Sequence, residues 1–124
     1  MAYGVLFRQH VAGGLQTVFY FDFDQSALTA EARGILDRNA KYLAQKPGAR
    51  IRIEGHCDER GSTEYNLALG ERRAKAAFQY LMDLGVDPNR MTVVSYGKEV
   101  PLDPGHNEAA WAKNRRGEFV EIQK

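Results

Sequence analysis

The strictest pattern in this chain is an alternating segment that runs directly into a long helical one. Over residues 50–57, the sequence RIRIEGHC alternates between two kinds of side chain, which is the period of a β-strand with one buried face. Residues 62–84 then carry apolar side chains at helical spacing, with Ser62 as the N-cap and Gly85 as the residue that ends the helix. A half-buried strand followed at once by a long amphipathic helix indicates an α/β layer.

The other elements follow from the same two periodicities. Runs of β-branched and aromatic residues predict strands, and apolar residues three to four apart predict helices. The strands are expected at residues 17–21, 91–96 and 116–122, and the helices at residues 30–45 and 108–113. The order is β-α-β-α-β-(α)-β, an α/β (α+β) arrangement in which at least the strands joined by helices are expected to run parallel.

Composition limits the domain count and the partners. The 124 residues suffice for one domain, and we expect an N-terminal extension at residues 1–16 and a single domain over residues 17–124. A formal net charge of +1 gives no general attraction to nucleic acid or anionic lipid, and no apolar run approaches the ~20 residues that cross a bilayer, so a soluble chain is expected. Cys57 is the single cysteine and the three histidines are scattered, so neither a disulfide nor a metal or other cofactor is predicted.

Two polar residues interrupt the apolar stripe of the long helix. Plotted at 100° per residue, the stripe contains Tyr65, Leu69, Ala76, Tyr80 and Leu84, and both Asn66 and Arg73 fall within it. A charged side chain on a core-facing stripe costs several kcal/mol unless it is paired, so Arg73 requires a carboxylate partner or a cleft beside it.

Three aspartates could supply that partner. Asp22 and Asp24 close the first strand, and Asp58 closes the second. If these strands run the same way, the three carboxylates meet at one edge of the sheet, where open α/β sheets bind ligands. The arrangement is then either a structural ion pair with Arg73 or a site for a zwitterion, whose ammonium goes to an aspartate and whose carboxylate goes to the arginine.

Two neighbours of Asp58 have simpler interpretations. His56 is expected to point away from the buried face of its strand, so a packing or hydrogen-bonding role is favoured over catalysis. Cys57 lies on the buried face and is expected to act as a small hydrophobe.

The DFD at residues 22–24 also raises the possibility of an enzyme. Two carboxylates one residue apart after a first strand are typical of haloacid-dehalogenase-type (DxD) phosphatases. Such an enzyme also needs a Thr shortly after the second Asp, a lysine motif and a distal acidic pair for magnesium. The QSAL that follows at residues 25–28 does not fit, so a phosphatase is the distant alternative and no catalytic residue is predicted.

A resemblance to a known family decides among these readings. The sequence GHCDERGSTEYNLALGERRA at residues 55–74 closely resembles the signature of the outer membrane protein A (OmpA) C-terminal domain family. The match extends to YFDFD, VSYGKE, and NEAA followed by KNRR, at residues 20–24, 94–99, 107–110 and 113–116. Within the family, these details are most similar to the lipoprotein branch of the Tol system.

The resemblance implies a binding domain without enzymatic activity. Its fold would be a sandwich of helices packed on a mixed four-stranded sheet. Its ligand would be peptidoglycan, bound non-covalently through the meso-diaminopimelate of the stem peptide, so that the domain tethers the outer membrane to the cell wall and contributes to envelope integrity and cell division. Other wall-anchoring members of the family, such as porin tails and flagellar stator domains, are the alternative.

The same resemblance implies a location and a protein partner. The domain would lie on the periplasmic side of the outer membrane, lipid-anchored in the full-length protein through an N-terminal cysteine that this chain lacks. The partner would be TolB, the periplasmic β-propeller protein of the Tol system, competing with the wall for an overlapping surface.

The family's site residues carry over position by position. Asp58 and Arg73 correspond to the pair that grips diaminopimelate, with Asp58 on the ammonium and Arg73 on the carboxylate. Five further residues are similar to pocket-lining or pocket-supporting positions: Phe21, Asp22, Asn66, Leu69 and Arg72. Three residues near the end are expected to be structural or at the rim: Asn114, Arg115 and Arg116. Cys57 and Gly117 depart from the family pattern, but neither removes a binding residue.

Overall fold

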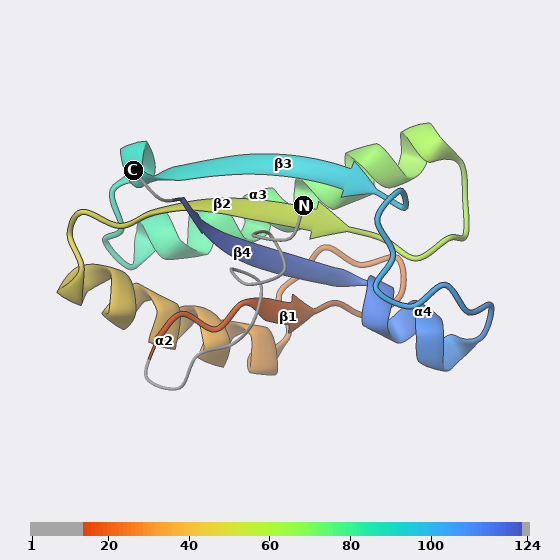
Figure 1. The fold of residues 1–124 in the computed structure, drawn as a ribbon, viewed down its shortest axis with the longest axis horizontal. Coiled ribbons are helices and arrows are strands. Elements are labelled where there is room, and N and C mark those ends of the chain that lie inside the picture. The colour runs from red at the N-terminus through yellow and green to blue at the C-terminus, as the bar shows by residue number, and fades with distance from the viewer. Residues whose placement is uncertain (1–13, 123–124) are drawn as a thin grey trace.

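The computed structural model describes residues 14–122 and contains four strands, three α-helices and one short 3-10 helix among them (Figure 1). In chain order these are β1 (Val18–Tyr20), α2 (Ala30–Gln45), β2 (Arg50–His56), α3 (Thr63–Asp83), the 3-10 helix (Pro88–Arg90), β3 (Met91–Gly97), α4 (Glu108–Asn114) and β4 (Arg116–Ile122). The caps are those that the sequence predicts, because Thr29 accepts from the Ala32 N–H at the start of α2 and Ser62 accepts from the Tyr65 N–H at the start of α3.

The four strands form one mixed sheet in the order β1-β4-β2-β3. Strand β4 is antiparallel to both β1 and β2, whereas β2 and β3 are parallel. Consequently β1, β2 and β3 all run the same way, and β4 lies between the first two of them. The predicted α/β sandwich with a mixed four-stranded sheet is confirmed.

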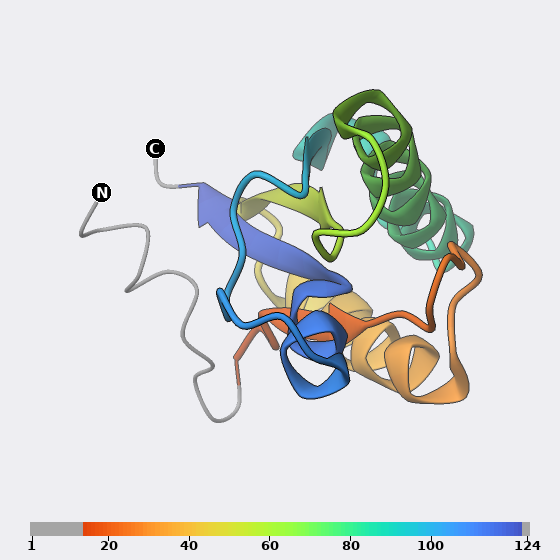
Figure 2. The same ribbon diagram turned by 90° about the vertical axis from the view of Figure 1, so that its right-hand side faces the viewer.

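Helices α2 and α3 cover the same face of the sheet, as the end-on view in Figure 2 shows. Between the helices and the sheet lies a continuous apolar core. Its fully buried members are Phe19, Leu36, Leu43, Ile51, Ile53, Ala74, Ala77, Leu81 and Phe119. Helix α4 stands apart from this layer, beside the edge at which β1 ends (Figure 2).

Glycines allow two close approaches within the sheet layer. A Cβ on Gly117 would lie 2.1 Å from the ring of Phe19, so the glycine in β4 leaves room for that ring to stack on Phe119 at 5.1 Å between centroids. A Cβ on Gly55 of β2 would lie 1.7 Å from the carbonyl oxygen of Gly70 in α3. Gly117 therefore continues the last strand, and α3 touches β2 backbone to backbone.

This close approach corrects the predicted stripe of α3. Tyr65 and Leu84 were expected to face the core but are 45% and 48% exposed. The buried side of the helix instead carries Asn66, Leu69, Gly70, Arg73, Ala74, Ala77 and Leu81. A helix that lies this close to a strand needs small side chains at the contact. The face of α3 that packs on the sheet is therefore the one that carries Gly70, Ala74 and Ala77.

The half-buried character of β2 is also corrected. Glu54 and His56 lie on the face that was expected to be open, yet both are fully buried. Glu54 accepts from Arg52 at 3.0 Å and one of its oxygens lies 3.0 Å from His56 Nε2, whereas His56 Nδ1 is buried without a hydrogen-bond partner among the described residues. Pairing of the Glu54 carboxylate with a guanidinium reduces the cost of burying its charge, and the alternation of the sequence alone does not reveal this pair.

The N-terminal boundary falls near the limit of the described residues. Of the predicted extension, residues 1–16, only the last three lie within the described range. There Leu15 joins the core, and the main chain of Gln16 exchanges two hydrogen bonds with the side chain of Asn39. Within residues 14–122, no helix is long and apolar enough to cross a membrane.

Candidate functional site

The ends of β1 and β2 lie side by side at one edge of the sheet. Tyr20 pairs with Arg116 and Gly55 with Gly117, so both strands finish against the first residues of β4. The loops that follow them and the first turns of α3 enclose a cavity of about 260 Å³. Its walls are formed by Phe23, Asp24, Cys57, Asp58, Arg60, Gly61, Tyr65, Asn66, Leu69 and Arg73. The predicted convergence at this edge therefore holds for Asp24 and Asp58.

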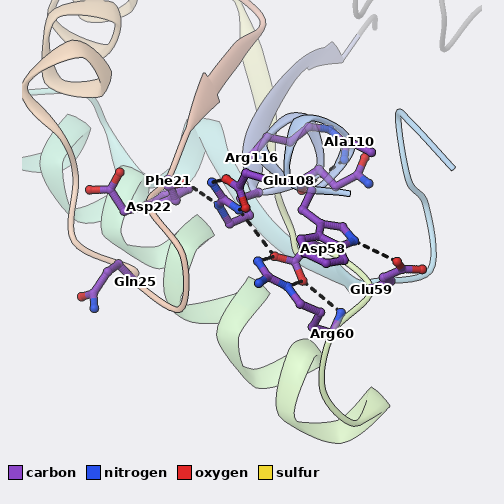
Figure 3. Close-up of polar contacts among 12 residues, drawn as sticks. Phe21, Asp22, Gln25, Asp58, Glu59, Arg60, Glu108, Ala110 and Arg116 are labelled. Carbon is purple, nitrogen blue, oxygen red and sulfur yellow. Dashed lines mark hydrogen bonds and ion pairs between the residues drawn. The ribbon is translucent and has the colours of Figure 1, made fainter. Parts of the chain in front are cut away.

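Asp58 is a buried carboxylate held by the residue two positions along the chain. Arg60 grips it with Nε at 3.1 Å from Oδ1 and Nη2 at 2.8 Å from Oδ2, and the Arg60 main-chain N–H donates to Oδ1 at 2.9 Å (Figure 3). Arg115 adds a longer contact, 3.8 Å from Oδ2. Burial acts to raise the pKa of Asp58, but the hydrogen bonds and charge of Arg60 lower it by more, so the pKa lies below its usual value.

Arg73 is only 1% exposed, and it reaches the cavity from α3. Its guanidinium donates to three main-chain carbonyls: Nε to Gln25 at 2.7 Å, Nη1 to His56 at 2.9 Å and Nη2 to Asp22 at 3.2 Å. Burial lowers its pKa, yet a guanidinium stays charged. Among the contacts of residues 14–122, Arg73 thus ties α3 to carbonyls rather than to a carboxylate, so the ion pair that the sequence suggested is absent.

The three carbonyls do not engage every N–H donor of the Arg73 guanidinium. An arginine carries five N–H donors, and the three bonds to residues 14–122 engage one donor on each nitrogen. At most one N–H on each of Nη1 and Nη2 is left over, and the Cys57 side chain is a further hydrogen-bond partner of the guanidinium. Nη1 and Nη2 together can bind a carboxylate as a fork.

Asn66 and Cys57 shape the wall between the two charged residues. The Asn66 amide donates to the carbonyls of Arg60 at 2.8 Å and Ser62 at 3.0 Å, which fixes the loop after β2 against α3. The Cys57 thiol donates to the Asn66 carbonyl at 3.2 Å, and burial raises its pKa. Cys57 is buried, as its place on the inner face of the strand predicts. Leu69 supplies an apolar wall.

The other predicted site residues lie outside this cavity. Phe21 is buried, and its ring centroid lies 5.0 Å from the Arg73 guanidinium in a cation–π contact. Asp22 contributes its carbonyl to Arg73, whereas its side chain points away from Asp58 toward a second cavity of about 450 Å³ next to α2 (Figure 3). Arg72 is exposed on α3 and is not among the residues that line either cavity.

Asp22 and Asp24 do not form a carboxylate pair. Asp24 adopts a left-handed backbone conformation with φ of 57° and accepts a hydrogen bond from the Tyr65 hydroxyl. Asp22 lines the other cavity. A phosphatase of the type considered above needs both carboxylates at one point, and this geometry separates them.

The three residues near the last strand, which were expected to be structural or at the rim, hold neighbouring segments together, and Arg115 also lines the second cavity. Asn114 accepts from the main-chain N–H groups of Leu102 and Asp103, which fixes the loop before α4. Arg115 donates to the Phe21 carbonyl at 3.1 Å and pairs with Glu108 at 3.0 Å, and Arg116 forms a buried pair with Glu118.

Arg60 and its aromatic neighbours were not predicted. The Arg60 guanidinium lies between the rings of Phe23 and Trp111, 4.1 Å from each centroid. Trp111 donates its ring N–H to Glu59 at 2.8 Å, so α4 is clasped to the loop after β2. These residues come from three separate segments, and only the DER at residues 58–60, opposite charges two residues apart, hinted at the contact.

Two curated relatives of this chain share a name. It is 54% identical over 108 residues to the peptidoglycan-associated lipoprotein of Pseudomonas aeruginosa, covering 87% of this chain and 62% of the relative. It is 52% identical over 97 residues to the protein of that name from Haemophilus influenzae, covering 78% and 63%. The chain therefore spans about three fifths of the length of these relatives.

Two solved structures have folds similar to that of this chain. The crystal structure of the peptidoglycan-associated lipoprotein from Burkholderia pseudomallei matches with a TM-score of 0.84 at 45% identity, covering 86% of this chain and 91% of that one. The C-terminal domain of Helicobacter pylori MotB matches in fold, with a TM-score of 0.79 at 24% identity over 90% and 87% of the two chains. The model of the OmpA family matches residues 20–115. The chain belongs to the OmpA family.

Proposed function

We propose that this domain binds peptidoglycan non-covalently by gripping the meso-diaminopimelate of the stem peptide, and that it has no catalytic activity. The observation that carries the proposal is a buried arginine guanidinium in the same cavity as a buried carboxylate. The similarity of this domain to proteins named peptidoglycan-associated lipoprotein supports the same ligand.

The proposed ligand fits the charges of the cavity. The free end of diaminopimelate carries an ammonium and a carboxylate on one carbon, so it needs an anion and a cation close together. Asp58 offers the anion, and Nη1 and Nη2 of Arg73 offer a fork for the carboxylate. Asn66 and Leu69 would hold the ligand's neighbouring atoms.

This binding gives the domain a tethering role. In that role it lies on the periplasmic side of the outer membrane, joined to it by a lipid anchor, and holds the envelope to the wall during growth and division. A tether requires reversible binding rather than a reaction, and two charged contacts in a surface cavity provide reversible binding.

Retention by isolated cell walls tests the proposal. The purified domain should co-sediment with diaminopimelate-type peptidoglycan and only weakly with the lysine type, because the lysine side chain lacks the carboxylate that Arg73 would bind. Asp58→Asn should abolish retention. Arg50→Ala, which removes an exposed arginine at the far end of β2, is the matched control and should be retained fully. Equal retention by both wall types would count against a pocket that reads the carboxylate.

The proposed Tol partner follows from the relationship to the named lipoproteins. The β-propeller protein of that system would bind an overlapping surface, so the propeller and a soluble wall fragment should weaken each other's binding by the same factor. A ternary complex formed without mutual weakening would contradict the overlapping site.

A further inference from the structure

The subsite for the ligand's ammonium already contains a cation. Arg60 occupies both oxygens of Asp58 with its side chain, at 3.1 and 2.8 Å. Under the proposed function, on which this inference rests, the same carboxylate receives the ammonium of diaminopimelate. The chain's own guanidinium thus stands where the ligand's charge has to go.

The Arg60 side chain is held by contacts that it can leave. It is 33% exposed, and beyond Asp58 its guanidinium contacts the faces of Phe23 and Trp111. Phe23 is itself 55% exposed. Cation–π contacts at exposed positions are weak, so little opposes rotation of the side chain toward solvent once another cation takes Asp58.

The Arg60 main chain, in contrast, is fixed independently of the side chain. Its carbonyl accepts from the Asn66 amide at 2.8 Å, and the next carbonyl, that of Gly61, accepts from Lys98 Nζ at 2.6 Å. The Arg60 N–H keeps its bond to Asp58 Oδ1 at 2.9 Å. The side chain can therefore leave without any rearrangement of the loop, and Asp58 retains one donor while it does so.

We propose that Arg60 is an internal competitor for the ammonium subsite, which binding of a diaminopimelate stem peptide displaces from Asp58. In the free protein, Arg60 keeps a buried carboxylate paired, which avoids the cost of an isolated buried charge. It also lowers the affinity of every cation that needs Asp58. A simple amine gains no other contact that offsets the cost of displacing Arg60, whereas a zwitterion gains a second contact at Arg73. Arg60 therefore selects against ligands that bind through an ammonium group alone.

Removal of the competitor gives the first test. Titration of a diaminopimelate-containing stem tripeptide, followed by calorimetry, should show roughly two- to fivefold tighter binding to Arg60→Ala than to the wild type, the factor expected for loss of a partly exposed ion pair. Arg60→Gln, which removes the charge but keeps a hydrogen-bond donor, should also bind more tightly. Arg50→Ala, with the same loss of charge at the far end of β2, should bind as the wild type does. Unchanged or weaker binding by both Arg60 variants would overturn the proposal, because Arg60 would then be a bystander or a direct contact of the ligand.

Trp111 gives a second readout that does not depend on affinity. It is the only tryptophan of the chain, and Arg60 lies against its ring. Binding of the tripeptide should change the Trp111 emission of the wild type and leave that of Arg60→Ala almost unchanged. An emission change of equal size in both proteins, or none in a wild type that binds, would overturn the proposal. A wild type that shows no binding by calorimetry would instead overturn the proposed function itself, and the inference with it.

Discussion

Arg73 has one structural role that its contacts show and one binding role that is proposed. Its guanidinium bridges the loop after β1 and the end of β2 through the carbonyls of Asp22, Gln25 and His56, and its remaining donors are proposed to bind the ligand. For the second role, the charge within an apolar stripe left open either a structural ion pair or a ligand site, and the family resemblance implied the ligand site. The first could not be predicted, because the partners are main-chain atoms of segments 17 to 51 positions away.

Loss of the Arg73 fork should therefore reduce both stability and binding. Arg73→Ala removes the donor of three carbonyls, of which only the His56 carbonyl lies in a fully buried contact. Asp22 and Gln25 are exposed, and the Asp22 carbonyl also accepts from the Gln25 N–H. One unpaired buried group costs about 1–3 kcal/mol, so the free energy of unfolding should fall by about that amount. Arg73→Lys keeps the charge but not the fork, and should be intermediate in stability while failing to bind stem peptide. Urea denaturation and calorimetry measure the two effects. Full binding by folded Arg73→Lys would contradict the ligand role.

His56 should make stability depend on pH. Burial lowers its pKa, as does the charge of Arg116, and Glu54 and Glu118 only partly oppose this. The folded state thus favours the neutral ring, which also stacks on Tyr96 at 5.4 Å. The unfolded chain binds the proton near pH 6.5, so the contribution of His56 is complete above that pH and is lost as the pH falls toward the lower folded pKa.

The melting temperature should accordingly decrease from pH 7 to pH 5. In His56→Gln, which cannot titrate, the decrease should be smaller, while the exposed His106 remains in both proteins. An equal decrease in melting temperature for the two proteins between pH 7 and pH 5 would rule out His56 as the source of the pH dependence.

At the scale of the elements, local sequence signals were sufficient where both ends carry a cap. Helix α2 begins after Thr29 as predicted, and the N-cap Ser62 and the left-handed Gly85 bracket α3. Which face of α3 is buried was harder to predict, because the answer depends on Gly70 meeting Gly55 of another element. The stacking of Arg60 between two rings was missed for the same reason.

Two glycine substitutions with opposite effects test that contact. Gly55→Ala would place a Cβ 1.7 Å from the Gly70 carbonyl oxygen, so the helix has to move and the cost should reach ~1–3 kcal/mol or more. Gly34→Ala in α2 has no closer neighbour than Arg38 Nη1 at 3.9 Å and should stabilise the helix by ~0.5–1 kcal/mol. Chemical denaturation of both variants measures the difference. Equal effects would show that the α3–β2 contact is less tight than described.

At the scale of the whole molecule, the position of β4 decides the site. Inserted between β1 and β2, it is antiparallel to both, which directs their C-terminal ends to one edge and brings Asp58 into the cavity that Arg73 reaches from α3. The sequence predicted this meeting only on the condition that the two strands run the same way. Periodicity cannot supply that condition, because pairing between strands about 60 to 100 residues apart is a property of the assembled sheet.

The most direct test of a pocket that reads both charges uses two stem tripeptides that differ only in the side-chain carboxylate, one ending in diaminopimelate and the other in lysine. Calorimetric titration of the wild-type domain should give at least about 30-fold tighter binding of the diaminopimelate peptide, the ratio that corresponds to loss of one buried charged contact at ~2 kcal/mol. Equal affinity for the two peptides would contradict the assignment of Arg73 to the ligand's carboxylate.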